Sequence, residues 1–127
     1  MLALIISLLM TANTSPTVLT VPIPNPQTQW LTALSNCESN GSTTVRVLDT
    51  NGRYSYGLFQ FQLGTWLAYG KDFGATKENI YSPDLQWEVA KSMLDAGGWK
   101  NWWNCGRDVE KSLGVYPAMA VSQKASS

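Results

Sequence analysis

Glu38 is the first charged side chain of the sequence, and it directly follows Cys37, one of only two cysteines. Trp30, Leu31 and Leu34 precede it at helical spacing, so we predict a helix over about residues 29–37 that ends near Glu38. The partial negative charge of a helix C-terminus disfavours an ionised carboxylate, and a dry site acts in the same direction. Both effects would raise the pKa of Glu38, as a general acid requires. The alternative is an ordinary solvated helix end.

Gln60 stands in an otherwise apolar segment, Gly-Leu-Phe-Gln-Phe at residues 57–61. Its amide offers a donor and an acceptor, which suits recognition of an amide or hydroxyl group on a ligand. The alternative is a buried strand whose Gln faces water. The six Trp and five Tyr residues also have two interpretations. They can be core, but indole faces also stack on sugar rings.

The composition excludes several classes of function. Histidine is absent, which removes Ser-His and Cys-His nucleophile pairs and the usual zinc ligands. Nine basic and nine acidic residues cancel, so no net field favours nucleic acid. No segment resembles a phosphate-binding loop, and the sequence offers no cluster typical of a metal site. We therefore expect no metal and no other cofactor.

The two cysteines, Cys37 and Cys105, form a disulfide if the protein is secreted, or remain free thiols if it is cytosolic. The apolar run Leu2–Met10 bears on this choice. It is too short to span a bilayer and about right for the core of a signal peptide. We predict that residues 1–12 are a signal peptide, with an uncleaved anchor as the alternative. The protein would then be secreted or associated with the cell envelope.

The remaining sequence predicts a small, mostly helical α+β domain. Residues 13–28 are rich in Pro and Thr and are interpreted as an extended linker, with Thr28 as a candidate helix cap. Residues 44–48 alternate in polarity, and Asn51-Gly52 then predicts a β-hairpin. Further helices are expected at three places, and residues 108–127 are expected to be a peripheral tail. Those helices are 64–69, a longer one between Ser82-Pro83 and Gly97-Gly98, and a short turn at 99–105.

Three motifs in order resemble a known family. They are Cys-Glu-Ser-x-Gly at residues 37–41, Gly-Leu-Phe-Gln-Phe at 57–61 and Trp-x-x-Cys at 102–105. Together they look like the resuscitation-promoting-factor and lytic transglycosylase group of the lysozyme-like superfamily. The match covers about residues 29–106, and any single piece of it is weak.

The resemblance implies a lysozyme-like domain over residues 29–107 that cleaves peptidoglycan between N-acetylmuramic acid and N-acetylglucosamine. By the family pattern Glu38 is the catalytic acid/base, and Cys37 pairs with Cys105 in a disulfide. The expected partner is the peptidoglycan glycan strand, bound by a monomer. The residues predicted to bind this substrate are Gln60, Tyr56, Ser55, Phe61, Asp49 and Trp102.

Asp49 is the best candidate for a second carboxyl group, because most glycosidases use two. It lies just before the Asn51-Gly52 turn, and a turn-capping role is the favoured alternative. A single carboxyl group suffices if the C6 hydroxyl of the sugar closes a 1,6-anhydro ring; otherwise water completes a hydrolysis. In two competing interpretations the protein has no enzymatic activity. One is a disulfide-stapled carbohydrate-binding module, and the other is a structural interaction protein whose Trp cluster is only core.

Overall fold

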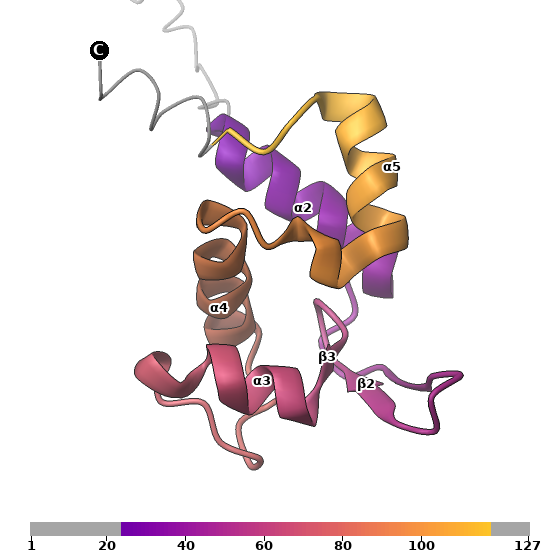
Figure 1. Cartoon of the computed structure of the whole chain (residues 1–127), viewed down its shortest axis with the longest axis vertical. Coiled ribbons are helices and arrows are strands. Elements are labelled where there is room, and N and C mark those ends of the chain that lie inside the picture. The colour runs from indigo at the N-terminus through magenta and orange to yellow at the C-terminus, as the bar shows by residue number, and fades with distance from the viewer. Residues whose placement is uncertain (1–23, 118–127) are drawn as a thin grey trace, which may run out of the picture.

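The computed structural model describes residues 24–117, and within them four α-helices, two 3-10 helices and a three-stranded sheet (Figure 1). The predicted signal segment and most of the predicted linker lie outside the described residues. The α+β, mostly helical class expected from the sequence is confirmed. In chain order the elements are α2 (Pro26–Ser39), β1 (Arg46–Leu48), β2 (Tyr54–Tyr56), β3 (Phe61–Gln62), α3 (Leu63–Tyr69), η1 (Lys71–Phe73), α4 (Pro83–Asp95), η2 (Trp99–Trp102) and α5 (Trp103–Leu113).

Helix α2 begins earlier than the sequence predicted. Its N-cap is Asn25, whose side chain accepts from the Thr28 N–H at 2.8 Å, and Pro26 is the first helical residue. The prediction that Thr28 caps this helix is therefore wrong. A proline at the first helical position loses no hydrogen bond, so the proline-rich stretch was able to start a helix. The helix ends as expected just after Glu38, where Asn40 adopts a left-handed conformation with φ 57°.

The sheet is a meander in which β2 pairs with both neighbours in antiparallel fashion. The predicted hairpin is present, and its turn is closed by a hydrogen bond from Gly52 N to Asp49 O at 3.0 Å. The prediction missed the third strand, β3, which has only two residues. Ser55 of β2 lies opposite Gln62 of β3, so the sheet aligns polar side chains across neighbouring strands.

Helices α3 and α4 form where the sequence predicted them. Ser82 caps α4 by accepting from Leu85 N, and Pro83 is its first residue. Its buried face includes Val89 and Met93. The helix stops at Asp95, and Gly97 follows with φ 84°, a conformation that glycine adopts without strain.

Helix α5 extends the packed part of the chain beyond residue 107, where we expected the peripheral tail to begin. Val109 and Tyr116 are buried. The ring of Tyr116 packs edge-on against Trp30, with centroids 5.6 Å apart, and Trp30 Nε1 donates to Gly114 O at 2.9 Å. Within α5 itself the buried residues are Gly106 and Val109, so the helix covers the core with one narrow face.

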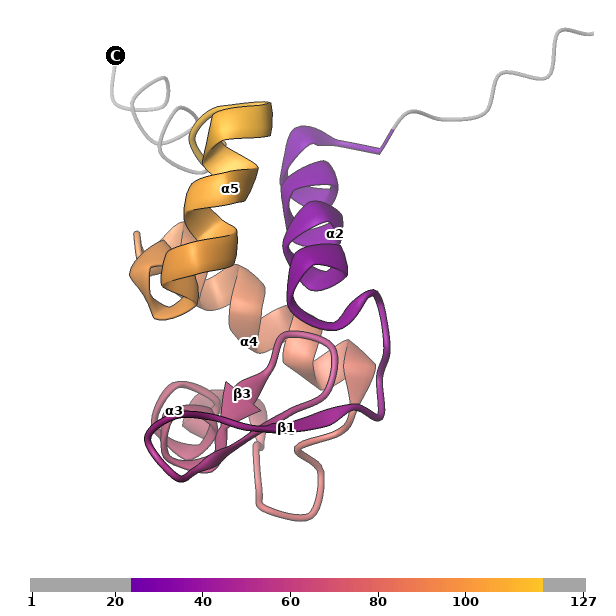
Figure 2. The ribbon, with the colours of Figure 1, turned by 90° about the vertical axis from the view of Figure 1, so that its right-hand side faces the viewer.

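The molecule has two parts joined through α4. Helices α2 and α5 lie side by side, and the sheet and α3 lie beyond their ends (Figure 2). Cys37 of α2 and Cys105 of α5 form a disulfide with a Cα–Cα distance of 5.7 Å, as the family resemblance implied. No helix within residues 24–117 is long and apolar enough to cross a membrane.

Candidate active site

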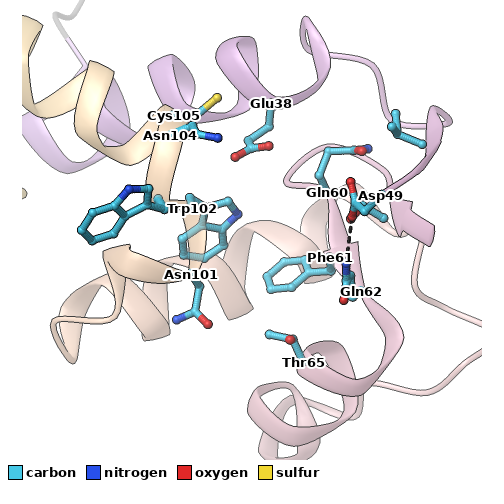
Figure 3. A pocket seen from close by; sticks show the side chains of 13 residues that line it. Glu38, Asp49, Gln60, Phe61, Gln62, Thr65, Asn101, Trp102, Asn104 and Cys105 are labelled. Carbon is cyan, nitrogen blue, oxygen red and sulfur yellow. Dashed lines mark hydrogen bonds between the residues drawn. The ribbon is translucent and has the colours of Figure 1, made fainter. Parts of the chain in front are cut away.

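A cleft of about 570 Å³ lies between the α2–α5 pair and the sheet (Figure 3). Glu38 and the first residues of α5 form one wall. The sheet and the beginning of α3 form the other. The lining residues are Glu38, Val47, Asp49, Ser55, Gln60, Phe61, Gln62, Thr65, Asn101, Trp102, Trp103, Asn104 and Cys105.

Glu38 points into this cleft from the last turn of α2. Burial raises the pKa of its carboxyl group to about 7, and the negative charge of Asp49 acts in the same direction. The direction is the one predicted from the sequence, where a dry helix end was the expected cause. A carboxylic acid with this pKa keeps a proton at neutral pH and can also give it up, which is what proton transfer to a leaving group requires.

A disulfide and a hydrogen bond hold the end of α2 that carries Glu38. On one side, the Cys37–Cys105 disulfide ties this end to α5. On the other, the Ser39 hydroxyl lies 2.8 Å from Leu58 O and 3.0 Å from Ser35 O, so it can donate to either carbonyl. The contact with Leu58 joins the helix to the loop between β2 and β3. The residues before and after Glu38 are therefore each attached to another part of the molecule, Cys37 to α5 and Ser39 to the loop between β2 and β3.

Asp49 faces the cleft from the sheet wall, and its side chain does not cap the turn. Its carboxylate accepts hydrogen bonds from Ser55 Oγ and, at 2.8 Å, from Gln62 Nε2 (Figure 3). The turn is instead supported by Asn51, whose side chain accepts from Arg53 N at 3.0 Å. The favoured turn-capping interpretation of Asp49 is therefore wrong, because two polar neighbours orient the carboxylate toward the cavity.

Gln60 lines the cleft, but half of its amide is already used within the loop. Its Nε2 donates to Gly57 O at 2.8 Å and to Val45 O at 3.3 Å. Its backbone has φ 55°, a left-handed conformation that costs a non-glycine residue roughly 1–2 kcal/mol. The amide oxygen remains to accept a hydrogen bond from a ligand. The strain at a cleft residue is typical of a functional position.

Trp102 and Phe61 form the floor of the cleft rather than its walls. Trp102 is only 5% exposed, its Nε1 donates to Phe59 O at 2.8 Å, and its ring packs edge-on against Phe61 with centroids 5.7 Å apart. Tyr56 does not line this cleft. It lines a separate hollow beside Arg53 and Leu67. Of the residues expected to bind substrate, five therefore lie together with Glu38: Asp49, Ser55, Gln60, Phe61 and Trp102.

Comparisons with known proteins agree with this architecture. Residues 25–105 match the model of the transglycosylase-like domain. The chain belongs to the transglycosylase-like domain family. It is similar to resuscitation-promoting factor Rpf1 of Corynebacterium glutamicum, with 35% identity over 93 residues. The aligned region is 73% of this chain but only 44% of that relative, so the chain spans less than half of the relative's length. No solved structure matches the chain significantly.

The transglycosylase-like domain carries cleft residues that the sequence reasoning missed. Gln62 follows the Gly-Leu-Phe-Gln-Phe motif directly and Thr65 lies three residues further on, but the two-residue strand β3 has no alternating pattern that could have placed Gln62 beside Asp49. Asn101, Trp103 and Asn104 surround Trp102, but nothing in the sequence distinguishes the adjacent indoles of Trp102 and Trp103. Val47 lies on the predicted strand. The missed residues are Val47, Gln62, Thr65, Asn101, Trp103 and Asn104.

The part of the domain that the structure describes holds no group of three or more His, Cys, Asp or Glu side chains suited to a metal ion. Glu38 and Asp49 are the ionisable side chains that line the cleft, and they belong to opposite walls. The arrangement offers one protonated acid and one carboxylate fixed by hydrogen bonds. This pair can protonate a leaving oxygen and stabilise a positive charge that develops beside it.

Proposed function

We propose that this domain cleaves the β-1,4 bond between N-acetylmuramic acid and N-acetylglucosamine in peptidoglycan, with Glu38 as the general acid/base. The observation that carries the proposal is the pKa of about 7 at Glu38, inside a cleft whose other wall is polar. The membership of the transglycosylase-like family supports the same class of reaction. Because peptidoglycan lies outside the cytoplasmic membrane, the proposal also implies secretion or attachment to the cell envelope.

In the first step Glu38 donates its proton to the glycosidic oxygen. The bond from C1 of N-acetylmuramic acid to this oxygen breaks, and N-acetylglucosamine leaves with a hydroxyl group. Positive charge develops at C1 and the ring oxygen, where the Asp49 carboxylate across the cleft would stabilise it. Ser55 and Gln62 hold Asp49 in place for this role. Glu38 is then a carboxylate.

In the second step the C6 hydroxyl of N-acetylmuramic acid attacks C1, and Glu38 takes the hydroxyl proton. The product is a 1,6-anhydro sugar, and the acid form of Glu38 is restored. Water can attack instead, with its proton also passing to Glu38, which gives a hydrolysed end. The two products differ by the mass of one water molecule, so mass spectrometry of the released muropeptides distinguishes them.

The test of the proposal is lysis of purified cell walls by Glu38→Gln. This change keeps the shape of the side chain and removes its acidic proton, so we expect the fold to persist and lysis to fall by at least about a hundredfold, the contribution typical of a general acid. Glu78→Gln is the matched control, because Glu78 is exposed and lies outside the cleft. Undiminished turnover by Glu38→Gln would overturn the mechanism.

A carbohydrate-binding module is the second candidate function. The exposed indole of Trp103 at the cleft favours it, because such a surface serves binding as well as catalysis. A zymogram, in which the gel contains cell walls, distinguishes the two functions. Binding by the wild-type protein without a cleared zone favours the module, while a cleared zone that Glu38→Gln loses favours the enzyme.

A further inference from the structure

Trp103 is the most exposed tryptophan among the described residues. Its side chain is 56% exposed, while the indoles of Trp30, Trp66 and Trp102 are buried. It is the first residue of α5, and it lines the cleft on the same wall as Glu38. Trp103 is not part of the hydrophobic core, which contains the neighbouring Trp102. What distinguishes this exposed indole is its place, because it borders the cleft that holds Glu38.

The indole of Trp103 is fixed in orientation by a second one. Trp99 stacks on it with an interplanar angle of 14° and ring centroids 5.7 Å apart. Trp99 in turn lies against Gly106 of α5, where an added Cβ would come within 2.9 Å of the Trp99 ring. Gly106 thus allows Trp99 to lie flat on the helix. Trp103 is therefore backed by Trp99 on one face, and its other face is free. Because its orientation is already fixed, little conformational entropy is lost when a ligand binds.

The wall opposite Trp103 has a complementary character. It presents Asp49, Gln60, Gln62 and Thr65, which can hydrogen-bond to the hydroxyl and amide groups of a sugar. A pyranose ring has polar edges and a face of C–H bonds, and indole faces stack on that C–H face. The cleft therefore offers one surface for the edges of such a ring and one for its face.

We propose that Trp103 is a stacking platform that binds one pyranose ring of the glycan strand on the α5 side of Glu38. This inference rests on the proposed function for the identity of the strand, but it concerns binding and not proton transfer. It reassigns the aromatic contact with substrate from Trp102, predicted from the sequence, to its neighbour. Trp103 is thus a binding residue that positions the strand relative to Glu38.

Substitution with matched controls tests the proposal. Trp103→Ala should raise KM for soluble glycan strands about tenfold and change kcat less, because the lost contact exists before the reaction begins. Trp103→Phe should recover a large part of the loss, since it keeps an aromatic face. Tyr69→Ala is the control, because Tyr69 is 52% exposed but lies outside the cleft. An unchanged KM for Trp103→Ala, or an equal effect of Tyr69→Ala, would overturn the proposal.

A measurement without any change at Trp103 guards against loss of fold in the variant. In Glu38→Gln, the indoles are oxidised with N-bromosuccinimide, with and without soluble strands from amidase-treated walls, and the sites are mapped by mass spectrometry. We expect the strands to slow oxidation of Trp103 at least threefold. Equal oxidation rates with and without strands would overturn the proposal.

The two proposals fail in different ways. If wild-type protein does not cleave walls but strands still protect Trp103, the proposed function fails and the platform stands. If wild-type protein cleaves walls while Trp103→Ala keeps the same KM and strands leave Trp103 unprotected, the platform fails and the function stands.

Discussion

Glu38 affects stability as well as chemistry, because its pKa differs between the folded and unfolded states. At pH 4 the side chain is largely protonated in both states and contributes little. Above its ordinary pKa of 4.5 the unfolded chain loses this proton while the folded protein keeps it until about pH 7, so the group lowers stability as pH rises through this window. Glu38→Gln should therefore stabilise the protein at pH 8 by roughly 1–3 kcal/mol and have little effect at pH 4.

Urea denaturation of both proteins at the two pH values measures this difference. Glu78→Gln serves again as the exposed control and should have similar small effects at both. A gain for Glu38→Gln that is the same at pH 4 and pH 8 would contradict a raised pKa, since a pH-independent gain indicates a packing effect.

The charge of Asp49 is predicted to set part of the pH range of activity. A general acid works while it is protonated, so activity should fall as pH rises through about 7. Asp49→Asn removes a negative charge that raises the pKa of Glu38, so this alkaline limb should move to lower pH. The shift should be modest, because burial is the larger cause.

The pH profile of wall lysis by wild type and Asp49→Asn tests this effect. A lower rate alone is also expected if Asp49 stabilises the transition state. An alkaline limb that stays at the same pH in the variant would show that Asp49 does not act on Glu38.

Sequence reasoning succeeded for residues whose role follows from type and local position. Glu38 is an acid at the end of an apolar helix, and this was enough to predict its raised pKa. The same reasoning could not predict which of Trp102 and Trp103 is buried and which is exposed at the cleft. Trp102 ends η2 and Trp103 begins α5, and the first indole is buried at the floor of the cleft while the second is exposed at its edge. Adjacent residues of the same type give no local pattern that separates the buried indole from the exposed one.

At the scale of elements, Gln86 of α4 holds the loop that carries Gln60. It is fully buried, its Oε1 accepts from Phe59 N at 2.8 Å, and its Nε2 donates to Tyr56 O at 2.9 Å and Ile80 O at 2.5 Å. Gly57 makes room for it, since an added Cβ there would come within 2.6 Å of Gln86 Nε2. The helix therefore supplies the hydrogen bonds that this short loop cannot make within itself.

Gln86→Leu should destabilise the protein by roughly 2–4 kcal/mol, because it leaves buried backbone groups of the loop without partners. Wall lysis should fall as well, since Gln60 would lose its support. Chemical denaturation and lysis of the same preparations measure both effects. Gln29→Leu is the control, because Gln29 is exposed and should change stability by less than about 0.5 kcal/mol. A stability equal to the wild-type value in Gln86→Leu would contradict this role.

The elements that the sequence predicted well have clear start and stop signals. Helix α4 has a Ser-Pro start and a Gly-Gly end, and both appear in the structure. The start of α2 was missed because prolines were interpreted only as linker residues, although one of them is the first residue of the helix. Strand β3 was missed because two residues are too few for an alternating pattern. The start of α2 is thus set by the local Asn25-Pro26 signal, whereas β3 is determined by its pairing with β2.

At the scale of the whole molecule, the cleft exists because the two parts are held apart at a fixed distance. The disulfide joins α2 to α5, and the Trp30–Tyr116 contact joins the other end of α2 to the segment that follows α5. Ser39 and Trp102 then join this pair to the loop between β2 and β3 through hydrogen bonds to Leu58 O and Phe59 O. The depth of Glu38 relative to the sheet wall follows from these connections together.

The disulfide should therefore affect activity beyond its effect on stability. It closes a loop with a sequence separation of 68, and its loss should destabilise the fold by roughly 4 kcal/mol on the chain-entropy model. Because Cys37 immediately precedes Glu38, replacing both cysteines with Ser should also lower wall lysis at a temperature where circular dichroism shows the variant to be folded. Lysis is then compared per folded molecule, with Tyr69→Ala as a control that leaves this region intact. Full activity of the folded double variant would show that Ser39 and the packing of α2 hold Glu38 in place without the disulfide.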